Sequence, residues 1–245
     1  MYFLILPLFL YTEGVQAQSR FRATVIGGMN LSQIDGDLQQ GYRKKDISVG
    51  LSCAAVFKPD FDVSAELFYN PRGAKPSPEG SPQSSKLFAT MNFQYADAVV
   101  LFNFHSFPHK TKDFYRQTLK LGFSYGRLLK SGVEVKYNGR LPLTEYEQEL
   151  LKGLKKDDIS LVVGAAWQFN PRWGVMIKHS SSMRRIYERI GVSSIAQIPN
   201  TEKDFRYLSP YFFSIQTFYH FVSPHKTLGV RRNKKNGGGD PLEEL

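Results

Sequence analysis

The sequence predicts an all-β protein, an eight-stranded antiparallel transmembrane β-barrel with long external loops and short periplasmic turns. Three observations lead to this prediction. Apolar and polar residues alternate with a period of two in eight segments of the chain. The connections between the segments run long, short, long, medium, long, short, long, with the medium one at residues 105–115, and outer-membrane barrels alternate long and short connections in this way. One face of the segments carries large apolar residues and the other carries small or polar ones, whereas a soluble barrel would have its apolar face inside.

The alternation places each segment and its two faces. It is clearest at residues 158–169, and the last segment, 207–222, keeps the same period. We expect strands at residues 20–31, 47–57, 62–71, 88–104, 116–129, 158–169, 173–183 and 207–222. We expect Val163, Trp167, Ile177 and Ile215 to face lipid, and Gly164, Gln168, Ser214 and Gln216 to face the lumen.

The connections separate a membrane barrel from a soluble β-sandwich. Proline-containing tight turns are expected at residues 58–61 and 170–172. Long polar loops are expected at 32–46, 72–85, 130–157 and 184–206, with a short surface helix within 143–156. A sandwich has no reason to sort its loops by parity. Eight strands fit the smallest barrel class, whose side chains nearly fill the interior, so we expect no open channel.

The composition excludes several other classes of protein. A hydrophobic content of 42% with a mean hydropathy of −0.33 excludes both a bundle of membrane-spanning helices and a wholly disordered chain. The aromatic share of 14% suits the two edges of a bilayer. The single cysteine, Cys53, excludes a disulfide framework and a multi-cysteine metal site. We expect no cofactor and no bound metal.

The two ends of the chain predict export and a tail. Residues 1–11 are apolar but too short to span a bilayer, and Val15-Gln16-Ala17 resembles a signal-peptidase site. We expect cleavage after Ala17, which removes Glu13 and changes the net charge from +10 to +11. The predicted organisation is a signal peptide at 1–17, an outer-membrane barrel domain at 18–222 and a basic, disordered periplasmic tail at 223–245.

Three short segments resemble PorT-type outer-membrane β-barrel proteins of Gram-negative bacteria, small barrels of the OmpX and OmpA kind. They are residues 27–37 with Gly41-Tyr42, residues 64–69 and residues 120–126. The resemblance implies a small barrel in the outer membrane, and some members of the family serve in a protein-secretion apparatus. The family often has an acidic residue followed by proline in its fourth strand, whereas Ala98 follows Asp97 here.

Four charged residues are expected on the lumen side: Glu66, Asp97, Lys120 and Lys178. They could form an ion or proton path, or a set of paired charges that fills and stiffens the barrel. We favour paired charges, because an unpaired charge in a narrow lumen is costly.

A second constellation defines an enzymatic alternative. His179 and Ser181 lie two residues apart at a strand end, and Glu188 follows in the next loop. In a lipid A acyl hydrolase they would serve as base, nucleophile and orienting carboxylate. A polar strand end that rises out of the membrane explains the same residues, and no oxyanion donors can be identified. We therefore expect no enzymatic activity.

The expected role is a structural or accessory component of an outer-membrane or secretion assembly, with lipids and an outer-membrane or periplasmic protein as partners and no nucleic acid. A soluble periplasmic binding barrel is the weaker alternative. Basic residues of the external loops could bind lipopolysaccharide phosphates. They are Arg43, Lys44, Lys45, Lys152, Lys155, Lys156, Arg184, Arg185 and Arg189.

Overall fold

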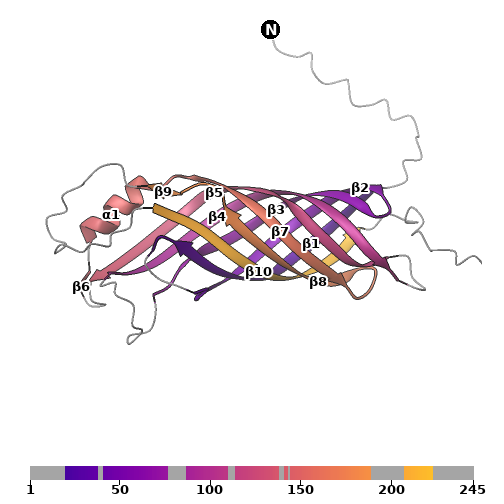
Figure 1. The fold of residues 1–245 in the computed structure, drawn as a ribbon, viewed down its shortest axis with the longest axis horizontal. Coiled ribbons are helices and arrows are strands. Elements are labelled where there is room, and N and C mark those ends of the chain that lie inside the picture. The colour runs from indigo at the N-terminus through magenta and orange to yellow at the C-terminus, as the bar shows by residue number, and fades with distance from the viewer. Residues whose placement is uncertain are drawn as a thin grey trace, which may run out of the picture.

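The computed structural model describes residues 20–37, 41–76, 87–109, 114–137, 141–142, 144–188 and 207–222. Eight long strands form a ring that is drawn side-on in Figure 1. They are β1 (Phe21–Asp35), β2 (Lys44–Lys58), β3 (Phe61–Ala74), β4 (Leu87–Pro108), β5 (Tyr115–Tyr137), β7 (Asp157–Gln168), β8 (Trp173–Ser182) and β10 (Tyr207–Val222). Two short strands, β6 (Leu141–Pro142) and β9 (Tyr187–Glu188), and the helix α1 (Thr144–Gly153) complete the described elements.

The ring is closed by the first and last strands. Every neighbouring pair is antiparallel, and β1 pairs with β10 from Ala23–Val222 to Asp35–Ser209. Because no long strand is left with a free edge, the backbone polar groups of the wall bond to one another. The predicted fold class, an eight-stranded antiparallel barrel, is confirmed.

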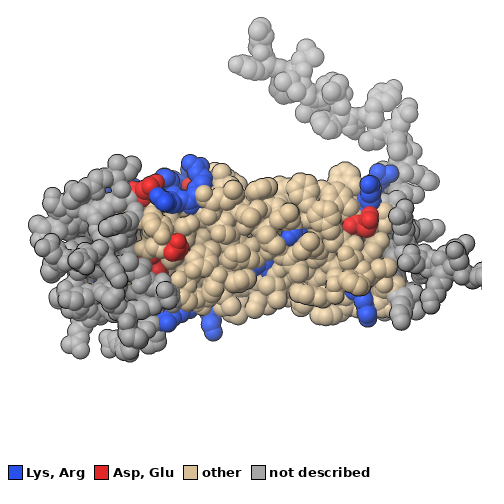
Figure 2. Space-filling view, in the orientation of Figure 1, with Lys and Arg blue, Asp and Glu red and all other residues tan. Residues whose placement is uncertain are grey.

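The two faces of the wall differ as the alternation predicts. Val163, Trp167, Ile177 and Ile215 point outward and are between 39% and 49% exposed. Ser214 and Gln216 point inward and are at most 3% exposed. On the face drawn in Figure 2, charged side chains gather toward the two ends of the described barrel, and the middle is uncharged apart from small blue patches. This exterior suits hydrocarbon rather than water.

Aromatic side chains form contacts near both ends of the apolar band. At the end with the short turns, the rings of Trp173 and Tyr219 lie 4.8 Å apart. At the opposite end, Tyr42 contacts Tyr211 at 5.4 Å between ring centroids. Tyr211 and Tyr219 are eight residues apart on β10. At a rise of ~3.3 Å per residue and a tilt of ~40°, they are separated by about 20 Å along the barrel axis, close to the ~25 Å band of outer-membrane barrels.

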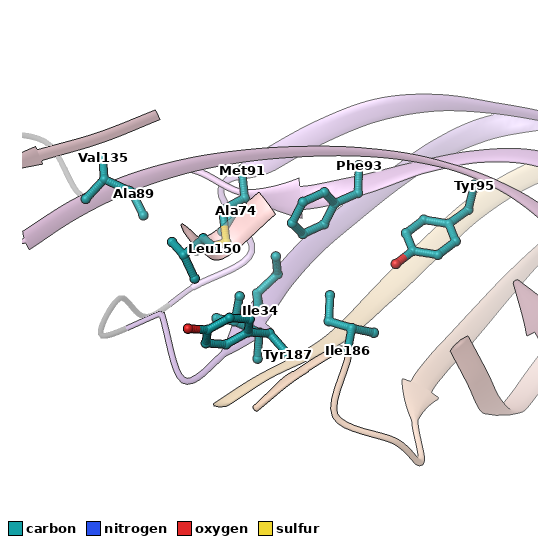
Figure 3. Close-up of a cluster of buried hydrophobic side chains, with 11 residues drawn as sticks. Ile34, Ala74, Ala89, Met91, Phe93, Tyr95, Val135, Leu150, Ile186 and Tyr187 are labelled. Carbon is teal, nitrogen blue, oxygen red and sulfur yellow. The ribbon is translucent and has the colours of Figure 1, made fainter. Parts of the chain in front are cut away.

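The strands are longer than predicted at the end with the long loops, which is the external end in the predicted orientation. β5 continues to Tyr137, although residues 130–137 are predicted to be loop. A large apolar core at this end, the external core, supports this extension. Its buried members are Ile34, Ala74, Ala89, Met91, Phe93, Tyr95, Val135, Leu150, Ile186, Tyr187 and Leu208. Figure 3 shows side chains from β4 turned toward those of β1 and of the segment around β9, so the core closes this end of the barrel.

The helix α1 lies within the range predicted for a surface helix, and it belongs to this end of the barrel (Figure 1). Leu150 is 1% exposed and packs in the external core. No helix in the described part of the chain is long and apolar enough to cross a membrane. The predicted signal peptide, its cleavage site and the predicted tail at 223–245 lie outside the described residues.

Arginine at the centre of the apolar band tests the assigned faces. Val163→Arg should lower the free energy of unfolding by about 2–4 kcal/mol, because the charge enters hydrocarbon. Phe169→Arg, on the same face but just beyond the end of β7, should cost about 0–1 kcal/mol. Urea titration of both variants in lipid vesicles measures the difference. Equal costs would contradict the assigned depth of Val163. A substitution on the inward face, such as Gly164→Ser, cannot serve as the control for Val163→Arg. An added Cβ at Gly164 would collide with the Ile177 carbonyl oxygen, so this change would destabilise the barrel for a steric reason.

Candidate functional site in the lumen

Three of the predicted lumen charges meet at one place. Glu66 on β3 is 1% exposed and accepts a hydrogen bond from Lys178 on β8 at 2.9 Å. Its other oxygen lies 3.6 Å from the ammonium of Lys120 on β5. Lys178 also lies 4.1 Å from the ring centroid of Phe68, which adds a cation–π contact. A carboxylate between two lysines is thus the centre of the lumen, and it ties three strands together.

Asp97, the fourth predicted lumen charge, lies in a different cluster. It is 3.3 Å from Arg72, whose guanidinium is also 3.2 Å from Asp158. Arg72 is 1% exposed and stacks over the Tyr95 ring at 3.8 Å. Asn70 donates a hydrogen bond to Asp97 at 2.6 Å. This cluster is the inverse of the first, since one cation here lies between two carboxylates.

The prediction that Arg72 begins an exposed loop is wrong. β3 continues to Ala74, and Arg72 keeps the inward direction of Glu66 and Asn70. The proline before it is tolerated because the pairing of β2 with β3 ends at Tyr69, which leaves Pro71 paired with β4 alone. The missed signal was the period of two, which runs without interruption through Arg72.

A third charged cluster lies at the end with the short turns. The Asp62 carboxylate accepts hydrogen bonds from Arg22 at 2.6 Å and from Asn103 at 2.6 Å. His105 Nε2 lies 2.7 Å from the same carboxylate. Asn103 in turn accepts a hydrogen bond from Lys120 at 3.1 Å, so this cluster is joined to the one around Glu66.

The charges of the three clusters balance. The cations are Arg22, Arg72, Lys120 and Lys178, and the carboxylates are Asp62, Glu66, Asp97 and Asp158. Leaving His105 aside, the formal charges cancel. Buried charges are tolerated when each one lies beside an opposite charge, and this condition is met here. Hydrogen bonding is less complete, because Glu66 Oε1 and Arg72 Nε have no hydrogen-bond partner among the described residues. The three clusters therefore carry no excess formal charge.

The lumen is also more apolar than predicted. A cluster of buried residues at its middle consists of Ile26, Phe68, Val99, Leu101, Val162, Ala166, Met176 and Phe218. Gly50 and Gly174 make room for it, because a Cβ at either position would collide with the ring of Phe68 or Phe218. The expectation that the inner face is small or polar therefore needs correction. Large inward rings fit because glycines face them.

The spaces left in the lumen are small. One cavity of about 40 Å³ is lined by residues of the Asp62 and Glu66 clusters. Another of about 20 Å³ lies beside Asp97 and Lys178. A cavity needs roughly 10–15 Å³ to hold one water molecule, so these spaces hold a few waters at most. Neither of these two spaces is large enough to hold a solute larger than a few waters. The same residues contain no group of three or more His, Cys, Asp or Glu side chains placed to bind a metal ion.

The residues of the enzymatic alternative do not form a catalytic arrangement in the described structure. The His179 ring packs on Phe213 at 4.5 Å between centroids, and its Nδ1 has no hydrogen-bond partner among the described residues. The Glu188 carboxylate is bound by Arg185 at 2.8 Å. Ser181 lies on the same outward face of β8 as His179. In the described structure Glu188 is thus paired with Arg185, and a histidine without an orienting carboxylate activates a serine far less well.

The nine basic residues predicted in external loops differ in exposure, and Arg43 is half-buried. Lys44 is 5% exposed on β2 and donates a hydrogen bond to Asp46 at 2.6 Å, so its placement in an exposed loop is wrong. Lys45, Lys152, Lys155, Lys156, Arg184 and Arg185 are exposed. Arg189 lies outside the described residues.

Comparisons with known proteins find similarity to solved structures alone. No family model and no curated protein sequence matches the chain. Neisserial surface protein A matches with 10% identity and a TM-score of 0.42, over 83% of this chain and 98% of its own. The outer membrane protein OprG of Pseudomonas aeruginosa matches with 13% identity and a TM-score of 0.40, over 85% and 99%. Ail of Yersinia pestis matches with 12% identity and a TM-score of 0.39, over 82% and 98%. The description of the barrel rests on its own strand pairing.

Removing the buried arginine tests the charge pairing. Arg72→Met should lower the free energy of unfolding by about 3–5 kcal/mol, because two buried carboxylates lose their cation. Arg127→Met should cost much less, because the Arg127–Asp157 pair is exposed to solvent. Adding Asp97→Asn and Asp158→Asn to Arg72→Met should recover most of the loss. Urea titration in vesicles gives all three values, and a loss that the two asparagines do not reduce would contradict the pairing.

Substitutions at the outward strand end test the enzymatic alternative. His179→Ala and Ser181→Ala should leave the lipid A acylation pattern of the cell unchanged, because the two residues are not joined to a catalytic carboxylate. Mass spectrometry of lipid A from cells that contain equal amounts of folded barrel provides the measurement. Loss of an acyl-trimming step in either variant would restore the hydrolase assignment.

Proposed function

We propose that the chain is an integral outer-membrane barrel that conducts no solute, catalyses no reaction and serves as a structural or accessory component of an assembly in that membrane. The observation that carries this proposal is the inverted distribution of side chains. Val49, Leu51, Leu67 and Phe123 are at least 50% exposed, while Glu66, Asp97 and Arg72 are at most 2% exposed. In water this arrangement would be unstable, and in a bilayer it is the stable one.

The filled lumen supports a role other than transport. Paired charges, an apolar layer and the external core succeed one another along the axis. A solute would have to displace groups that satisfy one another's hydrogen bonds. Breaking such a buried pair costs several kcal/mol, so spontaneous opening would be rare.

The accessory role rests on the resemblance to PorT-type barrels and on the external end of the molecule. β4, β5 and α1 extend beyond the apolar band, on the side where a partner protein outside the membrane would bind. A secretion assembly is the partner that the resemblance implies. Exposed lysines and arginines at the same end would bind lipopolysaccharide phosphates through charge-assisted hydrogen bonds. Affinity capture from detergent-solubilised outer membranes, with an unrelated barrel as control, tests for a defined partner, and recovery of the barrel alone would count against the accessory role.

Reconstitution in planar bilayers tests the closed lumen. The wild-type barrel should give no discrete current steps, because the lumen cavities lined by described residues hold only a few water molecules. A variant in which residues 144–153 are replaced by a glycine–serine linker should be equally silent, since the membrane-level lumen is filled without α1. Regular steps in the wild type would contradict the proposal. Steps in the linker variant alone would assign the closure to the external core instead of the lumen.

A further inference from the structure

A hollow lies in the outward surface of the barrel. It crosses β10, β1 and β2, and it is bordered by β8 on one side and β3 on the other. Its volume is about 620 Å³, within the range of roughly 300–1,000 Å³ typical of ligand pockets. Trp173 and Tyr219 line one side, and Leu51 and Leu67 line the other. Almost all of the lining is apolar, so the hollow is suited to a hydrocarbon chain.

The floor of the hollow is made by two small residues on adjacent strands. Gly27 on β1 pairs with Thr217 on β10, and a Cβ built at Gly27 would touch nothing within 4 Å. The Thr217 hydroxyl donates to the Gly174 carbonyl, which leaves a floor without a free donor. Two residues further along the strands, on the same outward face, Met29 pairs with Ile215, and both side chains are large and exposed. The hollow is therefore a local depression.

One end of the hollow carries a positive charge. Arg172 lies in the short turn between β7 and β8, is exposed, and its guanidinium is 3.4 Å from the hydroxyl of Tyr219. Tyr219 belongs to the lining, and its ring contacts that of Trp173 in a tilted arrangement. An apolar cleft that ends in a tyrosine hydroxyl and an arginine is complementary to an acyl chain that ends in a phosphate-bearing headgroup.

We propose that this hollow binds one phospholipid of the periplasmic leaflet, with an acyl chain over Gly27 and the phosphate on Arg172. The inference rests on the proposed membrane location and on the short turns lying on the periplasmic side. An acyl chain restores the dispersion contacts that the missing side chain at Gly27 leaves open. The arginine adds a contact with the phosphate, which a plain hydrocarbon surface lacks.

The two tryptophans allow a direct test. Trp167→Phe leaves Trp173, in the lining of the hollow, as the sole tryptophan. The mature chain is folded in maltoside micelles and titrated with phosphatidylglycerol that carries brominated acyl chains, which quench indole fluorescence. Saturable quenching at about one lipid per barrel is expected. Brominated diacylglycerol, which has the same chains and no phosphate, should bind about fivefold more weakly, the factor that corresponds to the ~1 kcal/mol typical of one basic residue at a membrane surface.

Variants separate the two parts of the site. Gly27→Leu should abolish saturable quenching, because the side chain would occupy the floor of the hollow, where an added Cβ meets nothing within 4 Å. Ala165→Leu, a matched change on the outward face of β7, should have no effect, since Ala165 pairs with Leu119 and Ile177 outside the hollow. Arg172→Gln should weaken phosphatidylglycerol binding about fivefold and leave diacylglycerol binding unchanged.

Each contrary result has a defined meaning. Equal quenching in Gly27→Leu and Ala165→Leu would overturn the site, and an unchanged Arg172→Gln would overturn the phosphate assignment. A lipid-free dimer that Gly27→Leu dissociates would assign the hollow to a second copy and overturn the lipid. Circular dichroism and heat-dependent electrophoretic mobility report whether the barrel has folded. Failure of the wild type to fold in micelles and vesicles would count against the proposed membrane function, whereas a folded barrel without saturable quenching would refute this inference alone.

Discussion

Closure of the sheet between β1 and β10 is the constraint on which the rest of the molecule depends. In hydrocarbon, an unpaired backbone N–H or C=O costs several kcal/mol, so a spanning sheet must have no free edge. The pairing from Ala23–Val222 to Asp35–Ser209 meets this requirement along most of both strands. It also fixes which residues face outward, because a shift by one residue would turn every side chain to the other face.

A ring of eight strands leaves an interior that side chains must fill. The chain fills it in layers, with charge clusters on both sides of the rings of Phe68 and Phe218. Glu66 lies between two lysines, and Arg72 lies between two carboxylates. The two clusters have opposite arrangements of charge, and together they bury charged groups without a net charge. The external core fills the end of the barrel that carries the long loops. The two ends of the molecule therefore differ, although the strand pairing between them is the same throughout.

The sequence was sufficient for the wall and insufficient for the interior. The range predicted for the last strand, 207–222, agrees with β10. The alternation in this segment is regular, and the residues that flank it in the sequence are polar, so both ends of the strand could be placed. Arg72 was missed because Asn70-Pro71-Arg72-Gly73 has the composition of a turn, while the absence of a β2 partner beyond Tyr69 is a tertiary fact. The pairing of Glu66 with Lys178, 112 residues away, likewise depends on barrel closure. The external core forms because β4 and β5 extend beyond the apolar band. No local sequence pattern predicted that extension.

The central claim is that the outward face of the wall is the one in contact with lipid, and photolabelling in vesicles with a membrane-soluble carbene precursor tests it without any mutation. β10 carries phenylalanines on both faces. Phe213 and Phe221 are 37% and 56% exposed, and Phe212 and Phe218 are both 5% exposed. Residue-level mass spectrometry should find the label on Phe213 and Phe221 and spare Phe212 and Phe218. Equal labelling of the two pairs, or no labelling of either pair, would contradict the claim.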